Sequence, residues 1–267
     1  MKINASLSAS LGLAMALAGA SAAVATTAQA DDRPLRIGVD VPYPPYQEKL
    51  PDGSLTGFEV ELVEAACERM QRQCEWVEQG WDGIIPGLLA RNYDAIMSSM
   101  AITDERAQRV LFSEAYYTTP SAWITTRDKE IDIEDRASLE GLTVGVQRAT
   151  LQDNYVTQLY GDVLEIRRYT GADDVVTDLM AGRLDLTFMD YPIAEATIDI
   201  DTPESDFQRI SDFIKQPEEI FGQGVGMAFR PRDEALAERF NEALQALKEN
   251  GTYDEIMNRY FNYDVRL

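Results

Sequence analysis

The chain has 267 residues and carries 46 acidic and 24 basic side chains, for a formal net charge of −22 at pH 7. Nucleic acid and anionic membranes repel such a polyanion, so the charge argues against both as partners. The sequence contains no histidine, which removes the commonest general base, the commonest metal ligand and any Ser-His-Asp triad. We therefore expect no catalytic residues and no metal site.

Residues 1–30 are typical of a secretory signal peptide. Lys2 precedes an alanine- and leucine-rich run over residues 7–25, and residues 28–30 form a small-x-small cleavage site. We expect cleavage after Ala30 and export of the mature chain to the periplasm. No stretch after Ala30 is long and uncharged enough for a transmembrane helix, so we expect no direct membrane insertion.

The first block of the mature chain alternates strands and helices. Residues 35–40 form a short apolar strand that runs into the proline-rich loop VPYPPY, where helix and sheet cannot continue. Apolar residues from Phe58 to Met70 recur at helical spacing. The other predicted elements are a strand at 74–77, a helix around 84–89, a buried strand at 94–98 and a short helix that Thr103 caps and that holds Arg106.

Cys67 and Cys74 are the two cysteines of the chain. An even count in an exported protein favours a disulfide over a metal pair or a catalytic thiol. Two cysteines also supply too few ligands for zinc. Because the loop between them is short, a disulfide here contributes modestly to stability.

A second alternating series follows residues 116–120. Its predicted strands cover 122–126, 142–146, 164–168 and 185–189, the last ending at Asp190, and its helices begin near Thr150 and cover 173–180. Alternation of this kind indicates an α/β fold.

The last segment contains a strand at 225–229, a helix at 233–248 and a final helix that reaches Phe261. The nearby glycines have the wrong spacing for a dinucleotide fingerprint, and the chain has no phosphate-binding P-loop, so we expect no cofactor. We interpret these glycines as positions of backbone freedom; they are Gly222, Gly224 and Gly226. We expect the segment to pack on the first block, giving one lobe from 31–119 and 223–267, a second from 120–222, and a hinge between them.

Five segments carry a resemblance to a known family. They read GFEVELVEAACERM, WDGIIPGLLARNYDAIMSSMAITDERAQRVLFSEAYY, GLTVGVQ, AGRLDLTFMD and ALKENGTYDEIMNRYF. In this order they resemble the polar amino acid branch of the periplasmic solute-binding proteins, which holds the histidine and the lysine/arginine/ornithine binding proteins. The resemblance covers the whole mature chain.

This resemblance implies two Rossmann-like lobes joined by two crossover strands, the type II periplasmic binding fold, with the ligand in the cleft. It implies a component of an ABC importer that closes over a polar, basic amino acid and delivers it to a membrane permease. Cys67 and Cys74 match the positions of a disulfide in the basic amino acid binders. We expect the protein to act as a monomer.

The same resemblance implies residues for the α-amino and α-carboxylate groups of the ligand. Arg106 matches the arginine that holds the carboxylate, a task that suits a planar guanidinium; alternatively it pairs with a neighbouring acid on an exposed helix face. Asp190 matches the acid that receives the ammonium; alternatively it only caps the next helix. The remaining matches are Ser98, Ser99 and Thr150.

Side-chain selectivity is expected at Asp40, Tyr43 and Trp81. Asp40 matches the acid that meets a distal ammonium or guanidinium, and an aromatic face can stack on such a cation. The alternatives are that Asp40 only caps its loop and that the two aromatic residues belong to the core.

Some residues depart from the family pattern. Ala101 stands where the basic binders have serine, and GVQRATLQ replaces a threonine-rich turn. If Arg148 points into the cleft, a ligand with a second carboxylate is favoured, such as an octopine- or nopaline-type opine; if it faces solvent, a basic amino acid is favoured. Rival functions are a periplasmic cyclohexadienyl dehydratase on the same fold and a sensor that signals to a membrane receptor.

Overall fold

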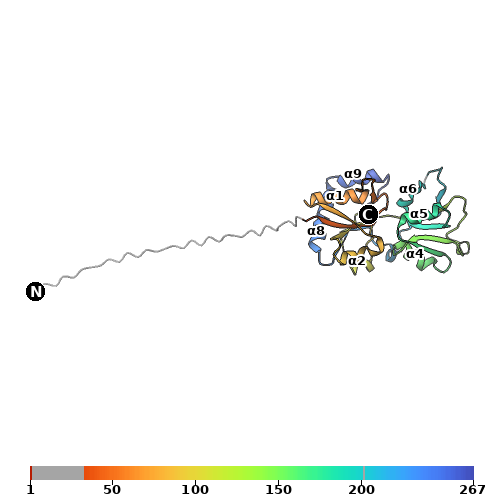
Figure 1. Cartoon of the computed structure of the whole chain (residues 1–267), viewed down its shortest axis with the longest axis horizontal. Helices are drawn as coiled ribbons and strands as arrows, with labels where there is room; N and C mark the ends of the chain where they lie inside the picture. Colours follow the sequence, from red (N-terminus) through yellow and green to blue (C-terminus); the bar gives the residue numbers. More distant parts are fainter. Residues whose placement is uncertain (2–32, 201) are drawn as a thin grey trace. The chain divides into compact units, whose positions relative to one another are not determined.

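The computed structural model describes Met1 and residues 33–200 and 202–267. Apart from Met1, the predicted signal peptide lies outside the described residues. All elements below belong to the unit Arg33–Leu267 (Figure 1). In the part of the chain that the structure describes, no helix combines the length and apolar character needed to span a membrane.

The first sheet has five strands in the order β4-β1-β5-β12-β6. Strand β1 is parallel to β4 and β5, whereas β12 is antiparallel to β5 and β6. The strands are β1 (Leu35–Val39), β4 (Cys74–Glu78), β5 (Ala95–Ile96), β6 (Leu111–Phe112) and β12 (Ala228–Phe229).

Helices cover both faces of the first sheet. Alternate residues of a strand point to opposite faces, so neighbouring residues of one strand pack against different helices. Ala95 and Phe229 belong to the core that also holds buried residues of α1, α8 and α9. Their neighbours Ile96 and Ala228 pack instead with Ile84 and other residues of α2. The helices are α1 (Phe58–Arg69), α2 (Ile84–Leu89), α8 (Glu234–Glu249) and α9 (Thr252–Tyr260).

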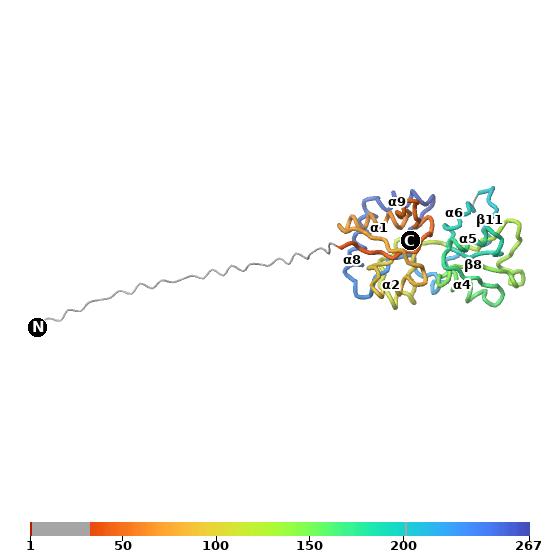
Figure 2. Tube along the Cα trace, in the orientation of Figure 1, coloured from red at the N-terminus to blue at the C-terminus, as the bar shows by residue number. Residues whose placement is uncertain are grey.

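The second sheet has the order β11-β7-β10-β8-β9. Strand β8 is parallel to β9 and β10, and β7 is antiparallel to β10 and β11. Figure 2 shows its elements grouped with α4, α5 and α6. The bounds are β7 (Ser121–Thr126), β8 (Thr143–Gln147), β9 (Glu165–Tyr169), β10 (Leu186–Asp190), β11 (Phe207–Arg209), α4 (Leu151–Tyr160), α5 (Ala172–Met180) and α6 (Tyr191–Ile198).

Short elements complete the fold. They are the hairpin strands β2 (Glu48–Lys49) and β3 (Leu55–Thr56), the 3-10 helices η1 (Trp81–Gly83) and η2 (Arg136–Leu139), and the helices α3 (Asp104–Ala107) and α7 (Glu218–Phe221). The predicted cap of α3 is confirmed, since the Thr103 hydroxyl accepts a hydrogen bond from the Arg106 backbone N–H at 3.3 Å.

The predicted strand 225–229 is wrong in extent, because β12 covers only its last two residues, Ala228–Phe229. Val225 makes isolated bridges to Ala101 and Tyr117 instead of continuing a ladder. Gly222 and Gly224 have positive φ values of 72° and 110°, which confirms their predicted backbone freedom. Gly226 is not among the positive-φ glycines, and there the prediction was wrong.

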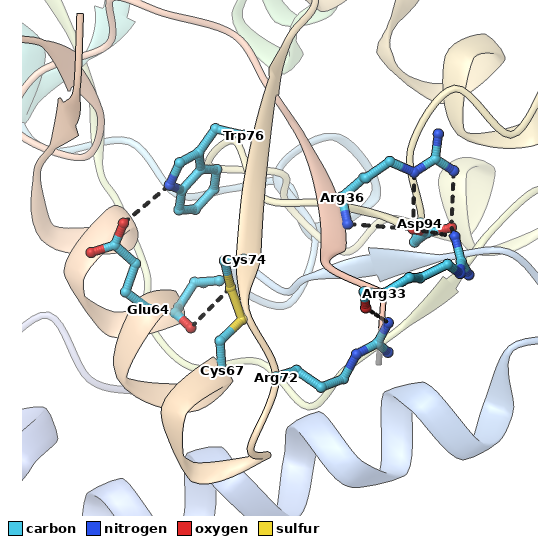
Figure 3. The surroundings of a disulfide bond; sticks show 9 residues. Arg33, Arg36, Glu64, Cys67, Arg72, Cys74, Trp76 and Asp94 are labelled. Carbon is cyan, nitrogen blue, oxygen red and sulfur yellow. Dashed lines mark hydrogen bonds and ion pairs between the residues drawn. A yellow bond between two sulfur atoms is a disulfide. The ribbon is translucent and has the colours of Figure 1, made fainter. Parts of the chain in front are cut away.

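The predicted disulfide between Cys67 and Cys74 is present, with the two Cα atoms 6.2 Å apart. It ties the end of α1 to the start of β4 (Figure 3). Beside it, the buried carboxylate of Asp94 accepts hydrogen bonds from the side chains of Arg36 and Arg230. These contacts join one end each of three strands of the first sheet, β1, β5 and β12.

Candidate functional site

A cavity of about 70 Å³ lies between segments of the two sheets. All eight residues predicted from the family pattern line it, together with residues from the connection that returns to the first sheet. The predicted residues are Asp40, Tyr43, Trp81, Ser98, Ser99, Arg106, Thr150 and Asp190. The structure therefore brings the predicted set together, although these residues lie up to 150 positions apart in the sequence.

Arg106 brings a guanidinium to this cavity. Its Nη1 donates to the Ala101 carbonyl at 3.1 Å, and its central carbon lies 5.0 Å from the centre of the Trp81 ring. Within residues 33–200 and 202–267, no carboxylate forms an ion pair with Arg106. Burial lowers the pKa of Arg106 to about 10, so the group remains a cation at neutral pH.

Asp190 ends β10 with its carboxylate in the cavity. One oxygen accepts from the Tyr43 hydroxyl at 2.7 Å; the other accepts from the Ser121 hydroxyl at 3.1 Å and from the Gln152 amide at 2.7 Å. Asp190 precedes α6 but makes no side-chain capping bond. Burial raises the pKa of Asp190 to about 6, since the charged form loses hydration.

Asp40 follows β1 and faces the same cavity. Its carboxylate accepts a hydrogen bond from Gln147 Nε2 at 2.8 Å. Burial raises the pKa of Asp40 to about 6, against the opposing effect of the Gln147 bond. Asp40 and Asp190 thus accept bonds only from neutral donors among the described residues, and neither has an ion-pair partner there.

The two predicted aromatic residues line the cavity, and each also contacts the opposite side of it. The Tyr43 hydroxyl reaches Asp190 on the second sheet. The Trp81 Nε1 donates to the Ala149 carbonyl, before α4, at 2.9 Å. Because the Trp81 ring already lies against Arg106, its stacking on a ligand cation stays a prediction.

The predicted serine and threonine residues have protein partners for their hydroxyl groups. Ser98 Oγ accepts from the Asp40 backbone N–H at 3.0 Å. Ser99 Oγ donates to Glu59 at 3.1 Å. Thr150 Oγ1 donates to the Gln147 carbonyl at 2.7 Å and caps α4. These bonds hold the walls of the cavity, and direct ligand contacts by the three hydroxyls remain predictions.

Sequence reasoning missed three polar residues at or beneath the site. Gln147 and Gln152 line the cavity and bond its two acids. Glu59 is fully buried behind Ser99. Its carboxylate accepts hydrogen bonds from the Ser99 backbone N–H at 2.6 Å and from the Ser99 hydroxyl at 3.1 Å. Burial raises the pKa of Glu59 to about 7. The sequence signal was an acid on the apolar face of the predicted helix 58–70.

Arg148 does not line the cavity. Its Nη2 pairs with the Asp82 carboxylate at 2.8 Å, and both side chains are about half-exposed. The contact joins the segment after β8 to η1, which follows β4. Arg148 therefore offers no partner for a second ligand carboxylate in the cavity, and of the two alternatives for this residue the one that favours a basic amino acid is left.

The sequence model of one protein family, the bacterial extracellular solute-binding proteins, family 3, matches residues 35–263 of the chain. The chain belongs to this family. The predicted membership in a family of solute-binding proteins is thereby confirmed.

Two relatives in this solute-binding family cover most of the chain. The L-arginine-binding protein of Pseudomonas aeruginosa is 40% identical over 238 residues, which are 88% of this chain and 91% of the relative. The histidine-binding periplasmic protein of Salmonella typhimurium is 35% identical over 86% of this chain and 88% of its own length.

Solved structures confirm the predicted two-sheet α/β fold. A Salmonella typhimurium periplasmic binding protein described for its high arginine specificity superposes with a TM-score of 0.78, at 27% identity over 86% of this chain and 100% of that one. An ancestral amino acid-binding protein, described as a precursor of cyclohexadienyl dehydratase, superposes with a TM-score of 0.74 and is 27% identical; the match covers 85% of this chain and 95% of that one.

Proposed function

We propose that this solute-binding protein captures a basic amino acid, with arginine as the first candidate, in the cavity between the two sheets. The observation that carries the proposal is the charge of the cavity: one guanidinium without an ion-pair partner and two carboxylates, Asp190 buried and Asp40 partly buried, that accept hydrogen bonds only from neutral donors, among the described residues. A basic amino acid has the complementary set, with one carboxylate and two cations. Buried charges are costly unless paired.

In this proposal each charged group of the ligand has one partner. Arg106 binds the α-carboxylate, Asp190 the α-ammonium and Asp40 the distal cation. Ser98, Ser99 and Thr150 support these contacts, and Tyr43 and Trp81 cover the ligand. Lys215 also lines the cavity, but its side chain is exposed and does not change the balance of the buried charges.

The partners of the ligand come from both sheets, which supports a mechanism by closure. The proposed lobes are 31–119 with 223–267, and 120–222. Only their closed arrangement satisfies all three ligand charges, so binding shifts the population toward it. Cross-cavity contacts such as Tyr43 to Asp190 are compatible with that arrangement.

The wider setting is part of the same proposal. We infer that residues 1–30 direct the chain to the periplasm, that the mature protein is a monomer, and that its closed form is recognised by an ABC permease. The family and its periplasmic relatives support this setting.

We further propose that the protein is not an enzyme. The cavity holds no histidine, and both of its acids fit the charges of a basic amino acid. The dehydratase alternative draws support from the structural similarity to a dehydratase precursor. An assay for aromatic product from arogenate or prephenate separates the two functions, and we expect no product.

A thermal-shift screen tests the proposed function. The panel is arginine, lysine, ornithine, histidine, glutamine, octopine and nopaline, and we expect basic amino acids to raise the unfolding midpoint, since ligands stabilise the state that they bind. Asp190→Asn is the matched control. It should fold, but the amino acids of the panel should not raise its unfolding midpoint. A panel without effect, or a stabilising compound that binds outside the cavity, would contradict the proposal.

A further inference from the structure

Gln147 ends β8 of the second sheet, and its side chain reaches across the cavity to Asp40 beside the first. Its Nε2 donates to Asp40 Oδ2 at 2.8 Å and to the Thr170 carbonyl at 3.0 Å. Both amide hydrogens are therefore used. The side chain is nearly buried, with 8% of the residue exposed, and it lines the cavity.

The two bonds fix which end of the amide faces which neighbour. Asp40 Oδ2 and the Thr170 carbonyl are both acceptors, so only the NH₂ end can face them. The carbonyl oxygen Oε1 is left at the other end and accepts no hydrogen bond from the described residues. An amide oxygen has two acceptor sites, so Gln147 brings an unused acceptor to the part of the cavity that holds Asp40.

The part of the site proposed for the distal cation thus combines the Asp40 carboxylate with the amide oxygen of Gln147. The two acceptors are separated by the Gln147 amide nitrogen, which donates to Asp40. A guanidinium has N–H groups on three nitrogens in a rigid plane and can donate to separated acceptors at once. An ammonium has a single nitrogen, which would have to reach both acceptors alone.

We propose that Gln147 is a specificity-determining residue that favours a guanidinium over an ammonium, so that the site discriminates arginine from lysine and ornithine. This inference rests on the proposed function. Asp40 supplies the charge that attracts either cation, and Gln147 Oε1 supplies a second acceptor that the planar cation uses better.

The test is the ratio of the arginine and lysine affinities, measured by isothermal titration calorimetry on the full mature protein. Gln147→Met keeps the length of the side chain but removes the amide. We expect arginine binding to weaken about tenfold or more, as for loss of a hydrogen bond to a charged group, and lysine binding to change by less than about threefold. The arginine-to-lysine preference should fall accordingly.

Gln152→Met is the matched control, because Gln152 is a second buried amide of the same cavity that bonds Asp190 instead. It should weaken arginine and lysine alike and leave their ratio unchanged. Gln147→Asn keeps the polarity and draws the oxygen back by one carbon. It should also lower the ratio, and it serves if the methionine variant does not fold.

A Gln147 variant that weakens both ligands equally would overturn the inference, since Gln147 would then only position Asp40. An unchanged or increased preference for arginine would overturn it as well. If the wild-type protein binds neither amino acid, the proposed function itself fails, and that result is distinct from an unchanged ratio in the variants.

Discussion

The guanidinium of Arg106 lies against the ring of Trp81, with its central carbon 5.0 Å from the ring centre. The same ring donates from Nε1 to the Ala149 carbonyl across the cavity. Trp81 therefore orients the proposed carboxylate-binding group and also contacts the segment that opens α4. Cation–π contacts of this kind contribute about 0.5–2 kcal/mol, depending on desolvation.

Replacement of Arg106 should abolish ligand binding while the fold is kept. Arg106→Ala removes the partner of a desolvated carboxylate, for which we expect a loss of about 3–5 kcal/mol. Arg106→Lys keeps the charge but not the planar fork, so it should rescue binding only in part. Calorimetry measures the affinity, and circular dichroism checks the fold. Binding of Arg106→Ala within a few-fold of wild type would refute the assigned role.

The affinity for a basic amino acid should fall steeply in acid. Burial raises the pKa values of Asp40 and Asp190 to about 6 in the ligand-free protein, and a cationic ligand needs both carboxylates ionised. Binding at or below pH 6 must therefore release protons. We expect roughly 100-fold weaker binding at pH 5 than at pH 7.5.

Calorimetry in two buffers with different ionisation enthalpies counts these protons. Asp40→Asn is the control, since it removes one of the two titrating groups and should reduce the number released at pH 6. Identical heats in both buffers for the wild-type protein would show that neither acid titrates with binding.

Glu59 should make the protein less stable as the pH rises. Burial raises the pKa of Glu59 from 4.5 to about 7 in the folded state, so between these values the folded state binds more protons than the unfolded state. The free energy of unfolding then decreases with pH, by at most about 1.4 kcal/mol per pH unit from this group. The contribution is fully present below pH 4.5 and is lost as the pH passes through 7.

The other Glu59 oxygen accepts a hydrogen bond from the Tyr116 hydroxyl at 2.6 Å. Glu59→Gln removes this titration but keeps an oxygen for the Ser99 N–H, while its new amide N–H can donate to the Tyr116 oxygen. Urea unfolding of both proteins at several values between pH 5 and pH 8 should give a flatter pH dependence for the variant. Asp40 and Asp190 contribute a slope of the same sign to both proteins, so only the difference is diagnostic. Parallel curves would exclude Glu59 as the titrating group.

The ion pair of Asp82 with Arg148 should strengthen ligand binding slightly and in a salt-dependent way. It connects segments attached to the two sheets, and because both side chains are about half-exposed, it contributes at most about 1 kcal/mol. Arg148→Ala should weaken arginine binding by up to about fivefold at low salt and less at high salt.

The exposed pair of Arg136 and Asp162 lies wholly beside the second sheet and provides the control. Arg136→Ala should leave the affinity unchanged. A double-mutant cycle of Asp82→Ala and Arg148→Ala measures the coupling, and a coupling energy of zero would show that the pair does not act in closure.

The sequence predicted the elements better than it predicted their contacts. The cap at Thr103 and the helix from Phe58 follow from local patterns, and both are present. Resemblance to the family selected the eight cavity residues. The contact of Gln147 with Asp40 joins positions 107 residues apart, and that of Glu59 with Ser99 joins positions 40 apart. No periodicity or spacing in the chain encodes such pairings, because the first depends on how the two sheets meet and the second on how α1 packs beside the end of β5.

The strand order also has a consequence for the way in which the chain acquires its structure. Strand β12 lies between β5 and β6 in the first sheet, although more than a hundred residues separate it from them. The strands of the second sheet are contiguous in the chain, from Ser121 to Arg209. Contacts between distant positions form slowly. We therefore expect the first sheet, whose strand β1 comes earliest in the chain, to be completed last, after the second sheet has already assembled.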